Sequence, residues 1–418
     1  MKQKRDIPAG WKYLKLKKLL TQDIKNGYSP NCPDKPNGSW ILSLGNLTEN
    51  GFDPTQAKPA PKGDSRVKDF LLEPGDFLIS RSNTLDKVGR TILFRGEIQN
   101  CSYPDLLMKF RIDETLVTNE YLEGYLRSSI VRKYIQSCAS GTSGSMVKIN
   151  KTVVEKIPVV LPPHPEQKAI GDLLSTWDEA IEKANRLIQT KKQRLDAYAR
   201  DLFDRKNDGK YEGWKVEKLK TVLNEHGDKS TGSEEVYSVS VHKGLVNQVE
   251  HLGRSFSAAN TDNYNCVHYG DIVYTKSPTG DFPLGVVKQS YAQNDVIVSP
   301  LYGVFRPKTF NLGLVLDFYF SSPKRARNYL FPIIQKGAKN TIAITNKTFL
   351  SKSLHLPVDE RAQKTVAEFV YAAREEIDLL KQLADKYKTQ KRGLMQRLLT
   401  GDWRIKPEIV KAFGEKGK

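Results

Sequence analysis

Two short polar loops carry the side chains best suited to recognising a nucleic acid. Each follows a Gly-Asp turn and an alternating strand, over residues 81–88 in the first half of the chain and 276–283 in the second. Forked or paired donors at such positions can read base edges in a DNA groove. The alternative is a pair of ordinary exposed loops. We predict DNA contacts from Arg81, Ser82, Asn83, Lys87, Lys276, Ser277 and Thr279.

A second pair of segments combines glycine with small polar and basic residues, over 141–148 and 336–341. Small residues allow the backbone to approach a phosphate, and backbone N–H groups bind phosphate without reading sequence. Ordinary exposed loops are again the alternative. The predicted contacts here are Thr142, Ser143, Ser145, Lys148, Lys336, Lys339, Asn340 and Thr341.

Motifs for catalysis are missing from the sequence. It contains no G-x-x-x-x-G-K-[ST] phosphate loop, no G-x-G-x-x-G and no N/D-P-P-Y/F motif of the kind that amino-methyltransferases use. Residues 23–25 have the D-x-K shape of a nuclease metal site, which is expected by chance in so charged a chain. Asp178, Glu179 and Glu182 are expected to form a solvated helix face. We therefore predict no catalytic residue.

Metal sites and disulfides are not predicted either. The four cysteines, at positions 32, 101, 138 and 266, are scattered, and the six histidines form no H-x-H or H-E-x-x-H pattern. A zinc site usually shows local pairs of ligands, and a disulfide framework needs more cysteine. Reduced thiols in a cytoplasmic protein are the expectation.

Composition indicates a large, basic, globular protein. The chain has 418 residues, of which 39% are hydrophobic and 27% charged, and its formal net charge is +18. Length suggests two to three domains. A protein this basic usually binds a polyanion, and nucleic acid is the first candidate. The alternative is a basic surface without a partner. A mean hydropathy of −0.52 argues against a membrane span, and no apolar stretch follows the charged N-terminus to make a secretory signal.

The chain is duplicated internally. GWKYLKLKKLL at 10–20 matches GWKVEKLKTVL at 213–223, and GDFLISR at 75–81 matches GDIVYTK at 270–276. EQKAIGDLL at 166–174 matches AQKTVAEFV at 362–370. A module of about 200 residues therefore occurs twice, and we expect a pseudo-two-fold axis to relate the copies.

Each module begins with a mixed α/β globule and ends with a long helix. Short β-type runs between turn signals fill the globule, and helical stretches follow at about 117–137 and 312–333. We predict globular domains at 1–160 and 208–355, spacer helices at 161–207 and 356–403, and a tail at 404–418.

Both helices carry an apolar seam at alternating intervals of four and three residues, with one lysine interruption each. Such a seam indicates a coiled coil. The first helix, about 38 residues from Glu166, would span roughly 57 Å. We predict an intramolecular antiparallel pair; the alternatives are packing on the helix's own globule or homodimerisation. The seam residues are Ile170, Leu174, Trp177, Ile181, Ile188, Leu195, Val366, Val370, Ile377, Leu380, Leu394 and Leu398.

Four motifs in order resemble the DNA specificity subunit of Type I restriction–modification enzymes over nearly the whole chain. They are IPAGW at 7–11 with its repeat GW at 213–214, LPPHPEQKAI at 161–170, and KRGLMQRLLTG at 391–401. The second copy of the helix entry departs from the pattern, because LPVDER stands at 356–361.

The resemblance implies two target recognition domains, each reading half of a split DNA site, with helices that set the spacing and dock two methyltransferase subunits. Those subunits would bring S-adenosylmethionine and methylate adenine, and a restriction/translocase subunit would bind ATP and Mg²⁺. This chain would hold no cofactor and have no activity. Two alternatives stay open: a stand-alone bivalent nucleic-acid-binding scaffold, and an enzyme such as a nuclease with an unrecognised site.

Overall fold

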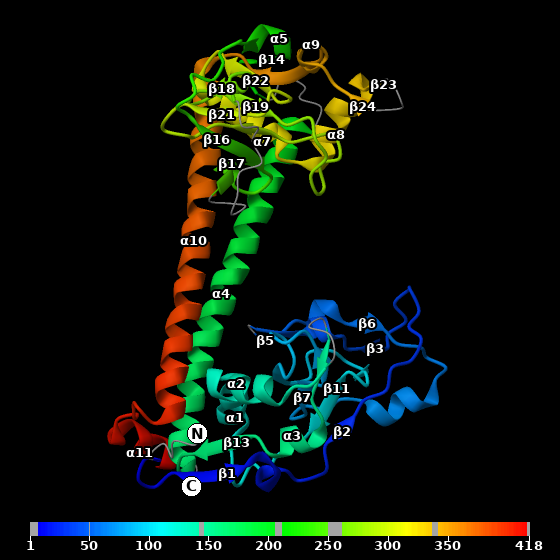
Figure 1. The fold of residues 1–418 in the computed structure, drawn as a ribbon, viewed down its shortest axis with the longest axis vertical. Helices are drawn as coiled ribbons and strands as arrows, with labels where there is room; N and C mark the ends of the chain where they lie inside the picture. The colour runs from blue at the N-terminus through cyan, green and yellow to red at the C-terminus, as the bar shows by residue number, and fades with distance from the viewer. Residues whose placement is uncertain are drawn as a thin grey trace. The chain divides into compact units, whose positions relative to one another are not determined.

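The computed structural model describes residues 7–49, 51–141, 146–204, 211–249, 261–336 and 342–415. The chain forms two compact units (Figure 1). Unit 1 comprises Met1–Asn185 and Gln382–Lys418, and unit 2 comprises Arg186–Lys381. This division differs from the predicted domains because each unit includes half of each long helix.

Unit 1 is built around a four-stranded antiparallel sheet in the order β2-β11-β7-β9. A three-stranded sheet, β10-β3-β6, and three strand pairs, β1 with β13, β4 with β5 and β8 with β12, complete it. The strands of unit 1 are β1 (Lys12–Lys15), β2 (Lys25–Asn26), β3 (Trp40–Ile41), β4 (Leu47–Thr48), β5 (Gly51–Phe52), β6 (Lys58–Pro59), β7 (Phe77–Ser80), β8 (Ser82–Asn83), β9 (Thr91–Leu93), β10 (Cys101–Ser102), β11 (Leu107–Phe110), β12 (Val147–Lys148) and β13 (Pro158–Leu161).

Helices cover this sheet and bury its apolar face. Phe77 and Phe110 stack on neighbouring strands, and the core they join includes Tyr121 of α1 and Ile135 of α2. Hydroxyl or amide side chains of the preceding residues cap the first turns of α1, α2 and α3. The helices are η1 (Leu16–Leu19), η2 (Leu44–Asn46), η3 (Pro54–Gln56), η4 (Ser65–Phe70), α1 (Asn119–Arg127), α2 (Ser129–Cys138) and α3 (Lys151–Glu155).

Unit 2 contains two four-stranded sheets, β15-β22-β19-β20 and β17-β16-β21-β18, with the pairs β14·β25 and β23·β24. Its strands are β14 (Trp214–Lys218), β15 (Leu223–Glu225), β16 (Glu235–Ser240), β17 (Gly244–Asn247), β18 (Asn265–Val267), β19 (Ile272–Tyr274), β20 (Val287–Gln289), β21 (Val296–Val298), β22 (Gly303–Pro307), β23 (Gln335–Lys336), β24 (Ile342–Ala343) and β25 (Ser353–Pro357). Its helices are α5 (Leu219–Val222), α7 (Phe310–Phe320), α8 (Pro323–Leu330), η5 (Phe331–Ile333) and α9 (Asn346–Leu350).

The two units share a strand order. In chain order, β2, β7, β9 and β11 of unit 1 take the same sheet positions as β15, β19, β20 and β22 of unit 2. The Gly-Asp turns before β7 and β19 both place glycine at positive φ, +93° for Gly75 and +90° for Gly270. The loops 81–88 and 276–283 therefore leave equivalent strands. In both units the Gly-Asp motif forms the turn that precedes the strand.

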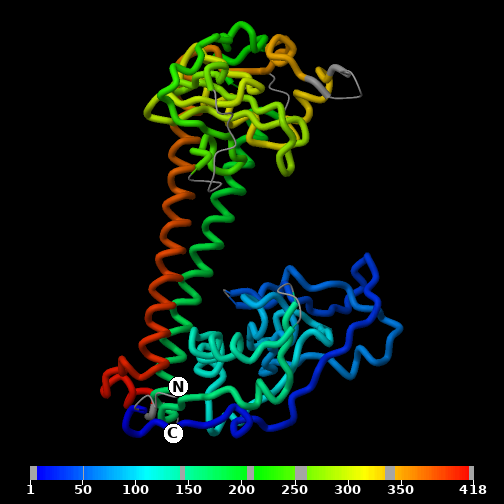
Figure 2. The backbone as a smooth tube through the Cα atoms, viewed as in Figure 1, coloured from blue at the N-terminus to red at the C-terminus, as the bar shows by residue number. Residues whose placement is uncertain are grey.

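Two long helices, α4 (His164–Phe203) and α10 (Glu360–Thr400), lie side by side (Figures 1 and 2). They run antiparallel within each unit. In unit 2, for example, Lys191 pairs with Glu376, and the ring of Tyr198 packs against that of Phe369 in a tilted arrangement. α4 begins two residues before the expected start. α10 is capped by the Asp359 carboxylate, which accepts from the Ala362 amide at 3.1 Å, and it ends at Gly401 with φ +78°.

The predicted seam residues face inward. Of the twelve, Ile170, Leu174, Ile181, Ile188, Val366, Val370, Ile377 and Leu398 are buried, and Trp177, Leu195, Leu380 and Leu394 are partly buried. Trp177 meets Tyr387 edge to face. No helix among the described residues is long and apolar enough to cross a membrane. A last helix, α11 (Pro407–Glu415), follows α10.

The two lysines that interrupt the seams reach acids on the opposite helix. Lys391 binds Asp178, and Lys191 Nζ lies 2.7 Å from Glu376 Oε1. Asp178 was expected to belong to a solvated face with Glu179. The side chain of Asp178 is 46% exposed, so it is partly solvated as expected, and its carboxylate is in addition the counter-charge of the buried Lys391.

Candidate nucleic-acid interface

The fold of unit 1 joins the two segments that the sequence singled out. Strand β8, inside the loop 81–88, pairs antiparallel with β12, so that Ser82 lies opposite Lys148 and Asn83 opposite Val147. The Ile149 amide also donates to the Arg81 carbonyl at 2.9 Å. Arg81, Asn83 and Lys148 therefore belong to one small strand pair at the end of β7.

Exposure distinguishes the candidates in unit 1. Lys87 and Lys148 are exposed, and Arg81 and Asn83 are partly exposed. The Ser82 side chain is buried, at 2% exposure, and its hydroxyl makes no hydrogen bond to any described residue. Ser82 therefore does not present its hydroxyl at the surface of this structure.

Helix α2 holds the loop of unit 1 from behind. Arg132 donates to the Val88 carbonyl and, at 2.9 Å, to the Asp86 carbonyl, while Gln136 donates to the Leu85 carbonyl. Burial and the nearby Arg90 charge lower the pKa of Arg132. Sequence reasoning missed these positioning residues because they lie on a different element, with no local pattern that links them to the loop.

The loop of unit 2 is a tight turn with a strained first residue. Lys276 has φ +57°, and a side chain at Gly285 would come within 2.8 Å of the Lys276 nitrogen. Thr279 and Phe282 exchange backbone hydrogen bonds of 3.0 and 2.9 Å. Ser277 and Thr279 are exposed, whereas Lys276 is partly buried and its pKa is lowered by burial.

Several predicted contacts lie outside the described residues, namely Thr142, Ser143, Ser145, Lys339, Asn340 and Thr341. The backbone of Lys336 lies in β23, which pairs with β24. Within the described ranges, no strand pairing joins β23 or β24 to the loop 276–283. The proximity that unit 1 shows between its two segments is thus not seen for unit 2.

The sequence predicted no metal site because the histidines are dispersed. The fold nevertheless gathers His226, Asp228 and His268, whose potential ligand atoms all lie within 4.8 Å of one another, and places Cys266 and Asp295 beside His268. No spacing in the sequence predicts this cluster, because its residues come from separate parts of unit 2 and meet only in the folded sheets.

Comparisons with known proteins agree on one family of similar proteins. Residues 8–192 match the model of the Type I restriction modification DNA specificity domain. A curated relative, the putative Type I restriction enzyme MjaX specificity subunit of Methanocaldococcus jannaschii, is 23% identical over 96% of this chain and 95% of its own length. The chain is thus similar to a Type I restriction enzyme specificity subunit over nearly its whole length, and its first half matches the specificity-domain model. The resemblance seen in the sequence motifs is confirmed.

Solved structures from Type I systems share the fold of this chain. The S subunit of M. genitalium superposes with a TM-score of 0.55 at 14% identity, over 95% of this chain and 98% of its own. A chain from a study of complex assembly and conformational transition in the Type I system gives 0.53 at 11% identity, over 96% and 100%. The mixed α/β class is thereby confirmed. The family model covers the loop 81–88, whereas the loop 276–283 lies beyond its matched residues.

Proposed function

We propose that this specificity subunit recognises a bipartite DNA site, with unit 1 reading one half and unit 2 the other. The observation that carries the proposal is the equivalence of two loops. Each leaves the same position of a sheet with the same strand order, and each begins with a cation, Arg81 or Lys276. Duplicated recognition elements match a target made of two half-sites.

The long helices are proposed to set the distance between the half-sites. Their apolar seams would form an antiparallel coiled coil, and a pseudo-two-fold axis would relate the two modules. A helix adds 1.5 Å per residue, so helix length would convert directly into spacer length. The cross-helix pairs of Lys191 and Lys391 support this register, since each lysine finds its acid only in one alignment of the helices.

The outward helix faces are proposed to dock two methyltransferase subunits. Three apolar side chains of the helices are exposed in unit 2: Leu187 at 41%, Tyr371 at 57% and Leu379 at 57%. Apolar side chains that point outward from helices otherwise lined with charge are suited to a protein partner. Those subunits would supply S-adenosylmethionine, and restriction/translocase subunits would supply ATP and Mg²⁺. The chain itself would be non-catalytic.

A binding experiment tests whether each loop recognises a different half-site. Replacing Arg81 by alanine should cost about 1–3 kcal/mol on the cognate duplex if the guanidinium reads a base edge. Specificity should relax in one half-site only, and Lys276→Ala should relax it in the other. The measurement is fluorescence anisotropy of the subunit with its methyltransferase partner, on duplexes substituted in each half-site.

Lys406→Ala, at an exposed position after α10, is the matched control and should bind like the wild type. An equal loss on cognate and random DNA would assign the cation to a phosphate. If both variants relax the same half-site, the proposed assignment of one unit to each half-site is wrong. Tight binding to split targets without any methyltransferase partner would instead favour a stand-alone scaffold.

A further inference from the structure

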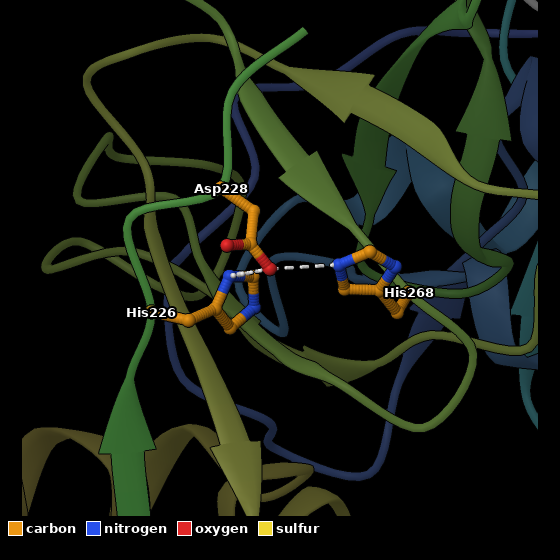
Figure 3. A group of neighbouring side chains, drawn as sticks. All are labelled: His226, Asp228 and His268. Carbon is orange, nitrogen blue, oxygen red and sulfur yellow. Dashed lines mark hydrogen bonds and ion pairs between the residues drawn. The ribbon is translucent and has the colours of Figure 1, made fainter.

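Two histidines and an aspartate meet at one point of unit 2 (Figure 3). His226 and Asp228 follow β15, and His268 lies between β18 and β19. One carboxylate oxygen, Asp228 Oδ2, is 3.2 Å from His226 Nδ1 and 3.0 Å from His268 Nε2. We propose that these three side chains bind a divalent transition-metal ion of the zinc class.

The spacing of the ligand atoms suits such an ion. Zinc bonds to nitrogen and oxygen of about 2.0–2.2 Å in tetrahedral geometry place neighbouring ligands about 3.3–3.6 Å apart. The two separations observed here, 3.0 and 3.2 Å, fall only a few tenths of an ångström short. Small side-chain rotations would therefore admit the metal without a change in the backbone.

Both rings are held by a second carboxylate at the nitrogen that faces away from Asp228. His226 Nε2 lies 2.9 Å from Asp271 Oδ2, and His268 Nδ1 lies 2.8 Å from Asp295 Oδ1. A neutral ring that donates its N–H to that carboxylate turns its lone pair toward Asp228. Carboxylates in this outer position are the usual partners of metal-bound histidines, because they fix the tautomer and the ring orientation.

One ring nitrogen of His226 faces Asp228 without forming a hydrogen bond to it. His226 Nδ1 is buried, its side chain is 10% exposed, and it makes no hydrogen bond to any described residue. In the neutral ring its lone pair would face the carboxylate oxygen of Asp228, an unfavourable contact between two acceptors. A cation between them converts that contact into two ligand bonds.

Charge balance favours a doubly charged ion. Asp228, Asp271 and Asp295 bring three negative charges, and Arg306, 3.7 Å from both Asp228 and Asp271, returns one positive charge. With neutral imidazoles the group carries a formal charge of −2, which a divalent ion cancels. Asp228 is 51% exposed, so solvent can reach the ion and supply its fourth ligand.

Unit 1 has no histidines at the equivalent position, and protein cations bind the corresponding aspartate there instead. Asp76, which occupies the position of Asp271 in the Gly-Asp turn, is bound by Lys109 Nζ at 3.1 Å and by Arg111 Nε at 2.6 Å. Two protein cations thus neutralise Asp76. The proposal is therefore restricted to unit 2, where the metal would tie the segment after β15 to the turn before β19.

Titration of the metal-free full chain with Zn²⁺ and with Co²⁺ tests the site. Calorimetry should show one tight equivalent, and the Co²⁺ form should show the d–d absorption of a site with nitrogen and oxygen ligands. His226→Gln or His268→Gln should weaken binding at least as strongly as the loss of an outer carboxylate, which typically costs about 10–100-fold. Asp295→Asn, at an exposed position, should weaken it within that range.

His242→Gln removes an exposed histidine outside the cluster and should leave the affinity unchanged. Circular dichroism of each variant identifies any loss of folding, and Asp295→Asn keeps the test valid if a histidine variant unfolds. Binding that does not saturate near one equivalent, equal affinity in all variants, or a thiolate-to-cobalt charge-transfer band would overturn the proposal.

Discussion

Replacing Arg374 by alanine should destabilise unit 2 alone. Arg374 of α10 binds the carboxylate of Asp317 on α7, whose side chain is only 3% exposed. The remaining cation, Lys288, is 3.6 Å from Asp317 Oδ1, and that oxygen has no hydrogen bond among the described residues. Removing one partner of a buried ion pair costs about 3–5 kcal/mol, and we expect the lower end of that range because Lys288 still compensates part of the buried charge.

Hydrogen exchange read out by mass spectrometry is the suitable assay, because it resolves the two units. If exchange proceeds through opening of unit 2, a loss of about 3–5 kcal/mol makes opening about 10²–10⁴ times more frequent. Amide protection in α7 and β20 should fall accordingly, whereas peptides of β7 and β11 in unit 1 should keep theirs.

The matched control is Arg361→Ala, an exposed arginine on the same helix, which should change protection little. Adding Asp317→Asn to Arg374→Ala should recover part of the loss, since an amide needs no counter-charge. Unchanged protection of α7 in Arg374→Ala would refute the assignment of this ion pair as a main support of unit 2.

The same pair predicts the sign of a pH effect. Burial raises the pKa of Asp317, but the charges of Arg374 and Lys288 outweigh burial and bring the pKa below its usual value. Its contribution to stability is therefore present above the unfolded pKa of about 3.9 and is lost as pH falls through the folded value. Without Arg374, burial raises the pKa, so the variant's deficit should shrink as pH falls from 7 toward 4 in urea unfolding.

Three further changes probe other parts of the chain. Burial lowers the pKa of Lys391. Lys391→Met removes the buried charge and leaves Asp178, which is 46% exposed and can be solvated by water, so the unfolding free energy in urea should change by less than about 1 kcal/mol. Arg132→Ala should cost about 1.5–3 kcal/mol in local protection of 84–88 and weaken binding to one half-site in anisotropy; unchanged exchange there would contradict the anchoring role. Deleting one heptad from both α4 and α10 should shorten the spacer by about 10 Å, or three base pairs, in a selection from random duplexes. A change in the half-site sequences themselves would contradict the proposal that helix length sets only the spacer.

Local patterns in the sequence predicted the features that depend on local physics. The four–three periodicity marked the seams because helical geometry alone decides which residues share a face. Gly75 and Gly270 marked the loops because their turns require a positive φ. The cross-helix role of Asp178 was not predictable from its own helix, where it reads as one more exposed acid beside Glu179.

Local sequence patterns did not predict contacts between segments that are distant in the chain. Arg132 reaches the Val88 carbonyl from a separate helix, and His268 reaches Asp228 across 40 residues of sequence. Neither spacing carries a periodic signal, because packing between separate elements, and not the geometry of a single helix or strand, brings these residues together. The division into compact units differs from the predicted domains for a related reason: each half-helix packs with the globule beside it, as Leu174 does in unit 1 and Val370 in unit 2.

The most direct test of the central claim is a map of modified bases in the source genome, with this gene intact and with it deleted, in cells that express the methyltransferase subunit. Recognition of a bipartite site predicts that a split motif of methylated adenine is present with the gene and absent without it. The two half-sites and the number of bases between them would be read from the same map. Methylation that is unchanged by the deletion would contradict the specificity role.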